Sequence, residues 1–153
     1  MYMKKRTLFR GQKPVLVCVT AQKRCDRLIK AGRMLADELD VPLELLSVQP
    51  VDAAPDERAA ALECLYALSK NAGADIMTYY SDDPVLTVAA HAKNCHARHI
   101  ITGTPSPSDA NFITPLHALV PDIPLTMVDP EGGRRILLPE TGKRGQRLAM
   151  NGS

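Results

Sequence analysis

Two short segments of the chain carry the residue types that bind phosphate. Residues 103–108 alternate glycine, hydroxyl residues and prolines, and residues 20–24 combine a hydroxyl and an amide with two cations. Backbone N–H groups of a glycine-containing turn, together with hydroxyls and cations, hold anions. We therefore predict an anion site formed by Thr20, Gln22, Lys23, Arg24, Gly103, Thr104, Ser106, Ser108 and Thr114. The alternative is a solvated loop with two surface cations.

Both segments follow apolar runs in a repeating strand–helix pattern. Continuous apolar runs predict strands at 15–19, 43–48, 75–80, 99–102 and 124–128. Between them, apolar residues at three- and four-residue spacing predict helices, one with an inward stripe of Ala61, Leu62, Leu65 and Leu68. We expect Ser81 or Asp82 to cap the helix that Pro84 starts, and Thr114 to cap a short helix that Pro115 starts. This alternation predicts a three-layer α/β/α domain with a five-stranded parallel sheet.

Charge divides the 153 residues into three parts. Residues 1–14 carry five basic side chains and no acidic one, and residues 130–153 carry five basic and two acidic side chains. The segment between them has a net charge of −6. We therefore predict a basic arm (residues 1–13), one domain (14–129) and a basic tail (130–153). Basic ends can dock a kinase, a transporter or a membrane surface, or they can be solvated. They lack interleaved aromatic residues, so we expect no nucleic-acid binding.

No apolar run is long enough to span a membrane, and the basic start lacks the apolar region of a signal peptide. The four cysteines are widely separated, which favours free thiols in the cytoplasm. Cys25 follows two cations at a helix start, an arrangement that lowers a thiol pKa and suits a redox sensor. The alternative is an inert structural cysteine.

His91 and Cys95 lie one helical turn apart, with His96 and His99 nearby, and such residues can bind zinc. The spacing is non-specific, and imidazoles near a helix C-terminus also interact favourably with the helix dipole. We therefore predict no metal site. Because the chain has no recognisable catalytic motif, we do not expect an enzyme, or at most slow ATP hydrolysis.

The chain resembles the universal stress protein superfamily, and most closely the stress-protein-like domain of potassium-sensing histidine kinases. The segments that carry the resemblance are 15–20 with 27–36, 67–80 with 82–83, and 100–103 with 123–128. The resemblance implies the strand order 3-2-1-4-5 of the adenine nucleotide alpha hydrolase-like fold. In that order the loops after the first and fourth strands face one crevice.

Nucleotide-binding members of this family have an Asp after the first strand and a Gly-x2-Gly-x9-Gly-Ser/Thr pattern after the fourth. Here Thr20 replaces the Asp, Gly103 matches the first glycine, and Ser106 and Ile113 replace the other two; Thr114 keeps the hydroxyl. These departures favour a non-enzymatic signalling module of the stress-response type. The alternative is a sensor that binds ATP, AMP or cyclic di-AMP in the crevice.

The family commonly forms dimers through the edge of the fifth strand. The matching residues here are Leu125, Thr126, Met127 and Val128, an uncharged run that would need cover if exposed. The resemblance therefore implies a homodimer through this strand, with a kinase or transporter as a further partner. The segment 135–138 is apolar after its first residue and is a candidate for an added edge strand or partner contact.

Overall fold

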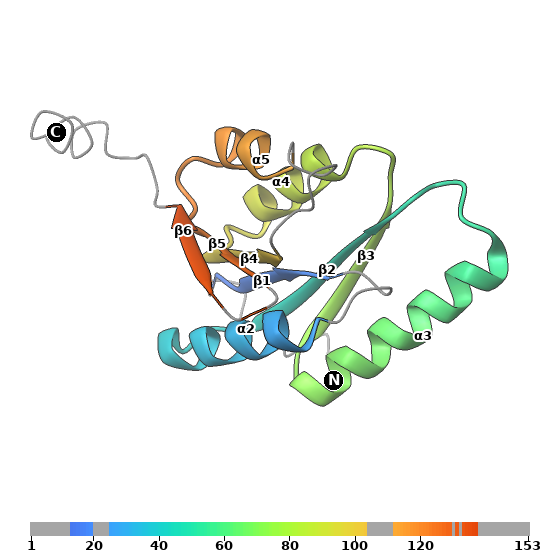
Figure 1. Ribbon diagram of the computed structural model, residues 1–153, viewed down its shortest axis with the longest axis horizontal. Coiled ribbons are helices and arrows are strands. Elements are labelled where there is room, and N and C mark those ends of the chain that lie inside the picture. The colour runs from blue at the N-terminus through green and yellow to red at the C-terminus, as the bar shows by residue number, and fades with distance from the viewer. Residues whose placement is uncertain (1–12, 20–24, 104–111, 130, 132, 138–153) are drawn as a thin grey trace, which may run out of the picture.

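A six-stranded sheet with the order β3-β2-β1-β4-β5-β6 forms the middle layer of the molecule (Figure 1). The structure, a computed structural model, describes residues 13–19, 25–103, 112–129, 131 and 133–137. The first five strands run parallel, and β6 pairs antiparallel with β5. The strands are β1 (Val15–Cys18), β2 (Leu43–Gln49), β3 (Asp75–Tyr80), β4 (His99–Gly103), β5 (Leu125–Val128) and β6 (Arg134–Leu137).

Two pairs of helices cover opposite faces of this sheet, as Figure 1 shows. One face carries the first two helices and the other face carries the last two, because each crossover between parallel strands is right-handed and the order reverses at β1. The described chain has no helix that is both long and apolar enough to cross a membrane. The helices are α2 (Asp26–Leu39), α3 (Pro55–Ala72), α4 (Pro84–Asn94) and α5 (Ile113–Leu119).

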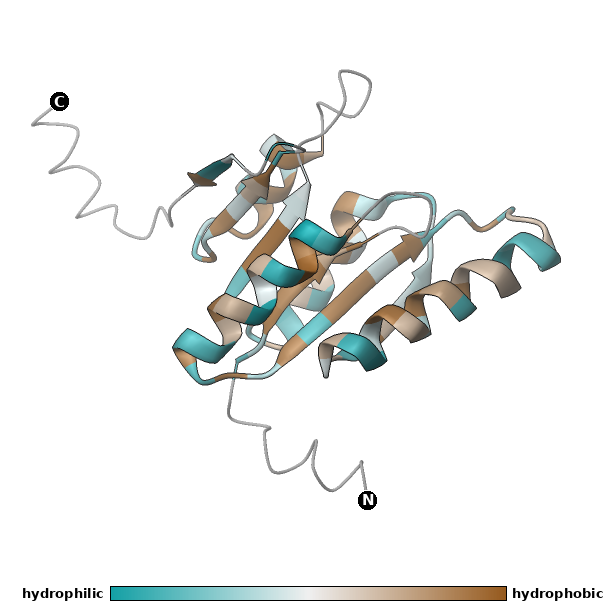
Figure 2. Cartoon of the chain, turned by 60° about the horizontal axis from the view of Figure 1, so that its bottom comes forward, coloured by the Kyte–Doolittle hydropathy of each residue, from teal (hydrophilic) through white to brown (hydrophobic). Residues whose placement is uncertain are grey.

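The core consists of two aliphatic layers, one on each face of the sheet. Val15 and Val17 point into the layer beneath α2 and α3, whereas Leu16 points into the layer beneath α4 and α5. All three side chains are 0% exposed. Figure 2 shows the same arrangement, with apolar residues concentrated on the strands and polar residues on the outer faces of the helices. A strand such as β1 is apolar along its whole length because helices cover both faces of the sheet, which is the basis on which the continuous apolar run predicted it.

The predicted order 3-2-1-4-5 is confirmed for the first five strands, and the sixth strand extends the sheet beyond it. All four residues of β5 pair with β6, from Leu125 opposite Leu137 to Val128 opposite Arg134. The expectation that Leu125, Thr126, Met127 and Val128 form a free edge is therefore wrong for this fold. A domain boundary at residue 129 also leaves out a strand that belongs to the sheet.

Two predicted helix starts need correction. The N-cap of α4 is Asp83, whose carboxylate accepts a hydrogen bond of 3.1 Å from the backbone N–H of Leu86, rather than Ser81 or Asp82. The helix α5 begins at Ile113, so Thr114 lies in its first turn and is not its cap. Pro115 fits there because the first four backbone N–H groups of a helix have no partner within the helix.

Gly32 lets α2 pack closely against the middle of the sheet. A Cβ atom at this position would overlap Cγ2 of Val17 and come within 3.1 Å of Leu43. Val17 is β-branched and fully buried, so it has little freedom to move aside. The glycine therefore sets the distance between α2 and β1.

We predict that Gly32→Ala lowers the free energy of unfolding by about 1–2 kcal/mol, because overpacking outweighs the gain in helix propensity. Urea unfolding followed by circular dichroism would measure the change. Ala at the neighbouring exposed position, Lys30→Ala, provides the control and should leave stability within about 0.5 kcal/mol of the wild type. A Gly32→Ala protein as stable as this control would contradict the close-packing argument.

Candidate functional site

The strand order reverses between β1 and β4, at the carboxyl edge of the sheet. The chain leaves β1 toward β2 through α2 on one face, and it leaves β4 toward β5 through α5 on the other face. In open parallel sheets this reversal opens the crevice in which ligands bind. The structure therefore places the ends of β1 and β4 where the sequence predicted a site.

The structure describes two of the nine residues predicted to form that site. Gly103 is the last residue of β4, and Thr114 is exposed in the first turn of α5. The other seven, Thr20, Gln22, Lys23, Arg24, Thr104, Ser106 and Ser108, lie outside the described residues.

Gly103 is not required by packing or by backbone conformation. A Cβ atom there would meet Leu28 at 3.7 Å, an ordinary van der Waals distance. Among the described glycines, Gly73 at the end of α3 is the one with a positive φ, of 65°. A Cβ atom at position 103 thus fits against Leu28.

Polar side chains near the carboxyl edge bond to neighbours on their own strands. The Gln49 amide donates to the Ser47 hydroxyl at 2.7 Å on β2, and the Thr102 hydroxyl donates to the Gly103 carbonyl at 3.1 Å on β4. Ser47, Gln49 and Thr102 are all buried. Sequence reasoning missed them because each lies within a strand.

Cys25 is buried at the start of α2, with 3% of its surface exposed, and it belongs to the apolar layer beneath that helix. Reactive cysteines are generally in partly exposed, electropositive surroundings. In this conformation a redox partner has little access to the thiol. Its two cationic neighbours in the chain lie outside the described residues.

A second group of chemically capable residues meets at His91, in the last turn of α4 near the opposite, amino edge of the sheet. Glu44 lies at the start of β2, whereas Tyr79 reaches the imidazole from the carboxyl half of β3, where it pairs with Val48. His91 on α4 contacts Glu44 on β2, with 2.9 Å between Nε2 and Oε1, and it contacts Tyr79 on β3, with 2.9 Å between Nδ1 and the hydroxyl. One helical turn further, Cys95 brings its sulfur within 4.8 Å of both the His91 and Glu44 donor atoms. We call Glu44, Tyr79, His91 and Cys95 the amino-edge cluster.

The amino-edge cluster holds a positive charge on its histidine. Hydrogen bonding to Cys95 and Glu44, with a further contribution from Tyr79, outweighs desolvation and raises the pKa of His91 to about 11. At neutral pH the ring is therefore an imidazolium that donates Nε2–H to the carboxylate and Nδ1–H to the phenol oxygen. The side chains of His91 and Glu44 are only 9% and 12% exposed, so this is a largely buried ion pair.

Sequence reasoning identified half of this cluster. The spacing of His91 and Cys95 was visible, but Glu44 and Tyr79 come from different strands. A carboxylate inside the otherwise apolar start of β2 was the available signal. His96 and His99 are not among the three metal-capable residues; His99 instead contacts the Thr126 hydroxyl at 2.7 Å, and burial lowers its pKa.

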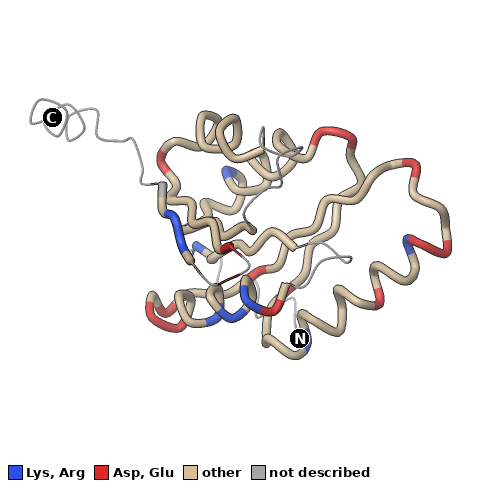
Figure 3. Tube along the Cα trace, in the orientation of Figure 1, with Lys and Arg blue, Asp and Glu red and all other residues tan. Residues whose placement is uncertain are grey.

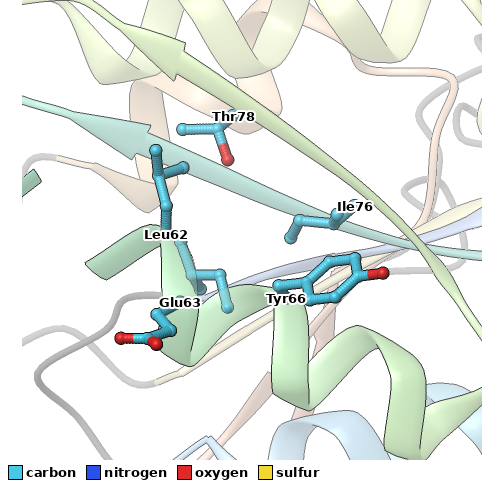
Figure 4. A pocket seen from close by; sticks show the side chains of 6 residues that line it. Leu62, Glu63, Tyr66, Ile76 and Thr78 are labelled. Atoms are coloured by element: carbon cyan, nitrogen blue, oxygen red, sulfur yellow. The ribbon is translucent and has the colours of Figure 1, made fainter. Parts of the chain in front are cut away.

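An apolar groove of about 340 Å³ lies between α3 and β3. Figure 4 shows Leu62 and Tyr66 of α3 beside Ile76 and Thr78 of β3. Leu62 and Tyr66 are 42% and 59% exposed, so the prediction that Leu62 faces the core is wrong. The buried stripe of α3 runs through Ala61, Leu65 and Ser69, and Leu62 is rotated about 100° from Ala61 around the helix.

Solved structures share this fold, although their sequences are distant. No model of a protein family matches the chain, and no curated protein matches its sequence. The universal stress protein from Archaeoglobus fulgidus has a TM-score of 0.57 and 17% identity, covering 76% of this chain and 97% of its own. The same Archaeoglobus protein in complex with dAMP has a TM-score of 0.56 and 16% identity, covering 76% of this chain and 96% of that one.

A protein of the universal stress protein family from Burkholderia pseudomallei is also similar, with a TM-score of 0.52 and 16% identity over 76% of this chain and 96% of its own. At these identities the comparisons establish the shared fold. They do not by themselves transfer a ligand or an activity to this chain.

We predict that His91→Leu lowers the free energy of unfolding by about 3 kcal/mol, because it leaves the Glu44 carboxylate buried without its partner. The double variant Glu44→Leu/His91→Leu should recover most of this loss, since it removes both charges. Urea unfolding at neutral pH, with a chelator present, would measure both. A double variant no more stable than His91→Leu would show that the ion pair is not the source of the effect.

Proposed function

We propose that this protein is a non-enzymatic regulatory module of the universal stress protein type, which acts by binding a second copy of itself and a signalling partner. The observation that carries the proposal is the strand order 3-2-1-4-5 with its reversal at β1, in a fold shared with three universal stress protein structures. The resemblance noted in the sequence points to the same superfamily. A cytoplasmic location and a kinase or transporter partner belong to this proposal.

The residue at the third glycine position of the nucleotide-binding pattern supports a module without bound nucleotide. Ile113 stands there, and it is buried in the apolar layer beneath α4 and α5. A glycine at such a position allows the backbone to approach a phosphate closely, which an isoleucine anchored in the core does not favour.

The proposed dimer uses the β3 edge rather than β5. The outer edges of the described sheet are β3 and β6. β6 presents Arg134 and Arg135, visible as the blue strand in Figure 3, and basic residues discourage strand pairing at an edge. β3 is uncharged from Ile76 to its last residue and lies beside the apolar groove. Two copies pairing antiparallel through β3 would place Asp75 of one opposite the uncharged end of the other.

We predict that the wild-type protein is a dimer at tens of micromolar and that Tyr66→Glu makes it a monomer. The substitution adds a charge to the groove without touching the core, because Tyr66 is 59% exposed. Light scattering coupled to size-exclusion chromatography would measure the mass.

Met34→Glu is the matched control, since Met34 is 58% exposed on α2. It should leave the dimer intact. A monomeric wild-type protein would contradict self-association, whereas a dimeric Tyr66→Glu would contradict the choice of the β3 edge.

A nucleotide sensor is the second candidate, favoured by the crevice at the reversal point and by the dAMP complex of a structural relative. Its phosphate-binding loops would be residues 20–24 and 104–111, which lie outside the described residues. The third candidate, docking through the basic ends, likewise depends on residues 1–12 and 138–153 outside the described chain.

We expect millimolar ATP, AMP or cyclic di-AMP to leave the melting temperature unchanged and to add no mass in native mass spectrometry. A nucleotide present at 100 times its dissociation constant would stabilise the protein by about 2.7 kcal/mol, a readily measured shift. Because a Cβ atom at position 103 meets Leu28 at an ordinary distance, Gly103→Ala tests the site without overpacking, and Gly103→Val adds bulk there. Nucleotide binding by the wild type that these substitutions abolish would favour the sensor over the nucleotide-free module.

A further inference from the structure

The amino-edge cluster contains an ion pair, Glu44–His91, beside an apolar layer in which apolar side chains would also support the fold. Glu44 follows the first residue of β2 and is 9% exposed, and the layer that α4 contributes is otherwise aliphatic. A buried ion pair generally adds less stability than well-packed apolar residues of similar volume, because both charges lose hydration. Stability alone therefore does not explain this pair.

The cluster combines three different donor atoms around one point. Oε1 of Glu44, Nε2 of His91 and Sγ of Cys95 all lie within 4.8 Å of one another. A tetrahedral zinc ion with bonds of about 2.0–2.3 Å holds its ligand atoms roughly 3.3–3.8 Å apart. Small side-chain movements would therefore bring the three donors to bonding distance of a single ion.

Tyr79 orients the histidine for this role. Its hydroxyl lies 2.9 Å from Nδ1, on the side of the ring opposite Glu44. Histidines that bind metals generally donate their second ring N–H to an oxygen, which fixes the tautomer and the direction of the ligating nitrogen. When the Nε2 proton is lost and Nδ1–H stays donated to Tyr79, the Nε2 lone pair is directed toward Glu44, with the Cys95 sulfur within 4.8 Å.

We propose that Glu44, His91 and Cys95 form a three-ligand site for Zn²⁺, with water as the fourth ligand. Nitrogen, sulfur and carboxylate oxygen together suit zinc, whereas Mg²⁺ and Ca²⁺ prefer oxygen ligands throughout. The charges balance, because a carboxylate and a thiolate neutralise the dication. On binding, the ion takes the place of the His91 Nε2 proton and the Cys95 thiol proton, and both protons pass to solvent.

This site is distinct from the candidate nucleotide crevice, which lies at the other end of the strands. Its ligands join the last turn of α4 and the residue after it to the start of β2. Zinc bound there would cross-link a helix end to a central part of the sheet and stabilise the folded state by mass action. None of the three zinc ligands belongs to the candidate nucleotide site or to the β3 edge, so zinc binding is tested separately from nucleotide binding and dimerisation.

The first experiment uses the wild-type protein. After treatment with a chelator and its removal, one equivalent of Zn²⁺ should add one zinc per chain in native mass spectrometry. Peptide mapping should show that zinc slows alkylation of the partly exposed Cys95 at least tenfold and leaves the exposed Cys64 unchanged. Failure to bind zinc at micromolar concentration, or equal alkylation of Cys95 with and without zinc, would overturn the proposal.

The second experiment compares Cys95→Ser with Cys64→Ser, using Co²⁺ as a spectroscopic substitute for zinc. The wild type and Cys64→Ser should show a thiolate-to-cobalt charge-transfer band and tight zinc binding. Cys95→Ser keeps the Glu44–His91 pair, so it should fold, lose the band and bind zinc at least 100-fold more weakly. Wild-type affinity in Cys95→Ser would overturn the assignment. If that variant does not fold, the alkylation result on the wild type decides.

Discussion

Helices pack on both faces of β1, and its residues Val15, Leu16 and Val17 consequently have no exposed surface. A strand buried in this way has to satisfy its backbone groups with a neighbour on each side, which here are β2 and β4. Because both neighbours run parallel to it, the chain must cross over through helices, to one face for β2 and from the other face for β4. The central position of β1 thus produces the two layers and the reversal of strand order between β1 and β4.

The two ends of the sheet differ in chemistry. At the carboxyl edge, the buried polar side chains of Ser47, Gln49 and Thr102 carry hydroxyls and an amide, which bond locally and bring no charge into the core. At the amino edge, a carboxylate and an imidazolium meet under α4, with a phenol and a thiol beside them. The fold is shared with solved structures of universal stress proteins, one of them in complex with dAMP. The amino-edge cluster lies on this scaffold at the end of α4, away from the point where the strand order reverses.

The two outer edges of the described sheet differ in how well they suit association with another chain. β6 covers β5 and presents arginines, so the fold itself shields the strand that the sequence offered as a dimer edge. Among the residues that the structure describes, no further strand covers β3, and α3 leaves large apolar side chains exposed beside it. Removing these apolar surfaces from water is the physical gain that favours binding at this edge.

Local patterns in the sequence determined much of the architecture. Apolar runs located five of the strands, helical spacing located the helices between them, and the alternation of the two predicted a parallel sheet; these depend on neighbouring residues along the chain. The outward position of Leu62 and the pairing of β6 with β5 depend on packing between elements. The amino-edge cluster shows the same limit. His91 and Cys95 are one turn apart in the sequence, but Glu44 and Tyr79 lie on different strands, and only the sheet register and the placement of α4 bring them to the same imidazole. A hydrogen bond across 47 residues leaves no periodic trace in the chain, so the tertiary structure alone decided which of these residues meet.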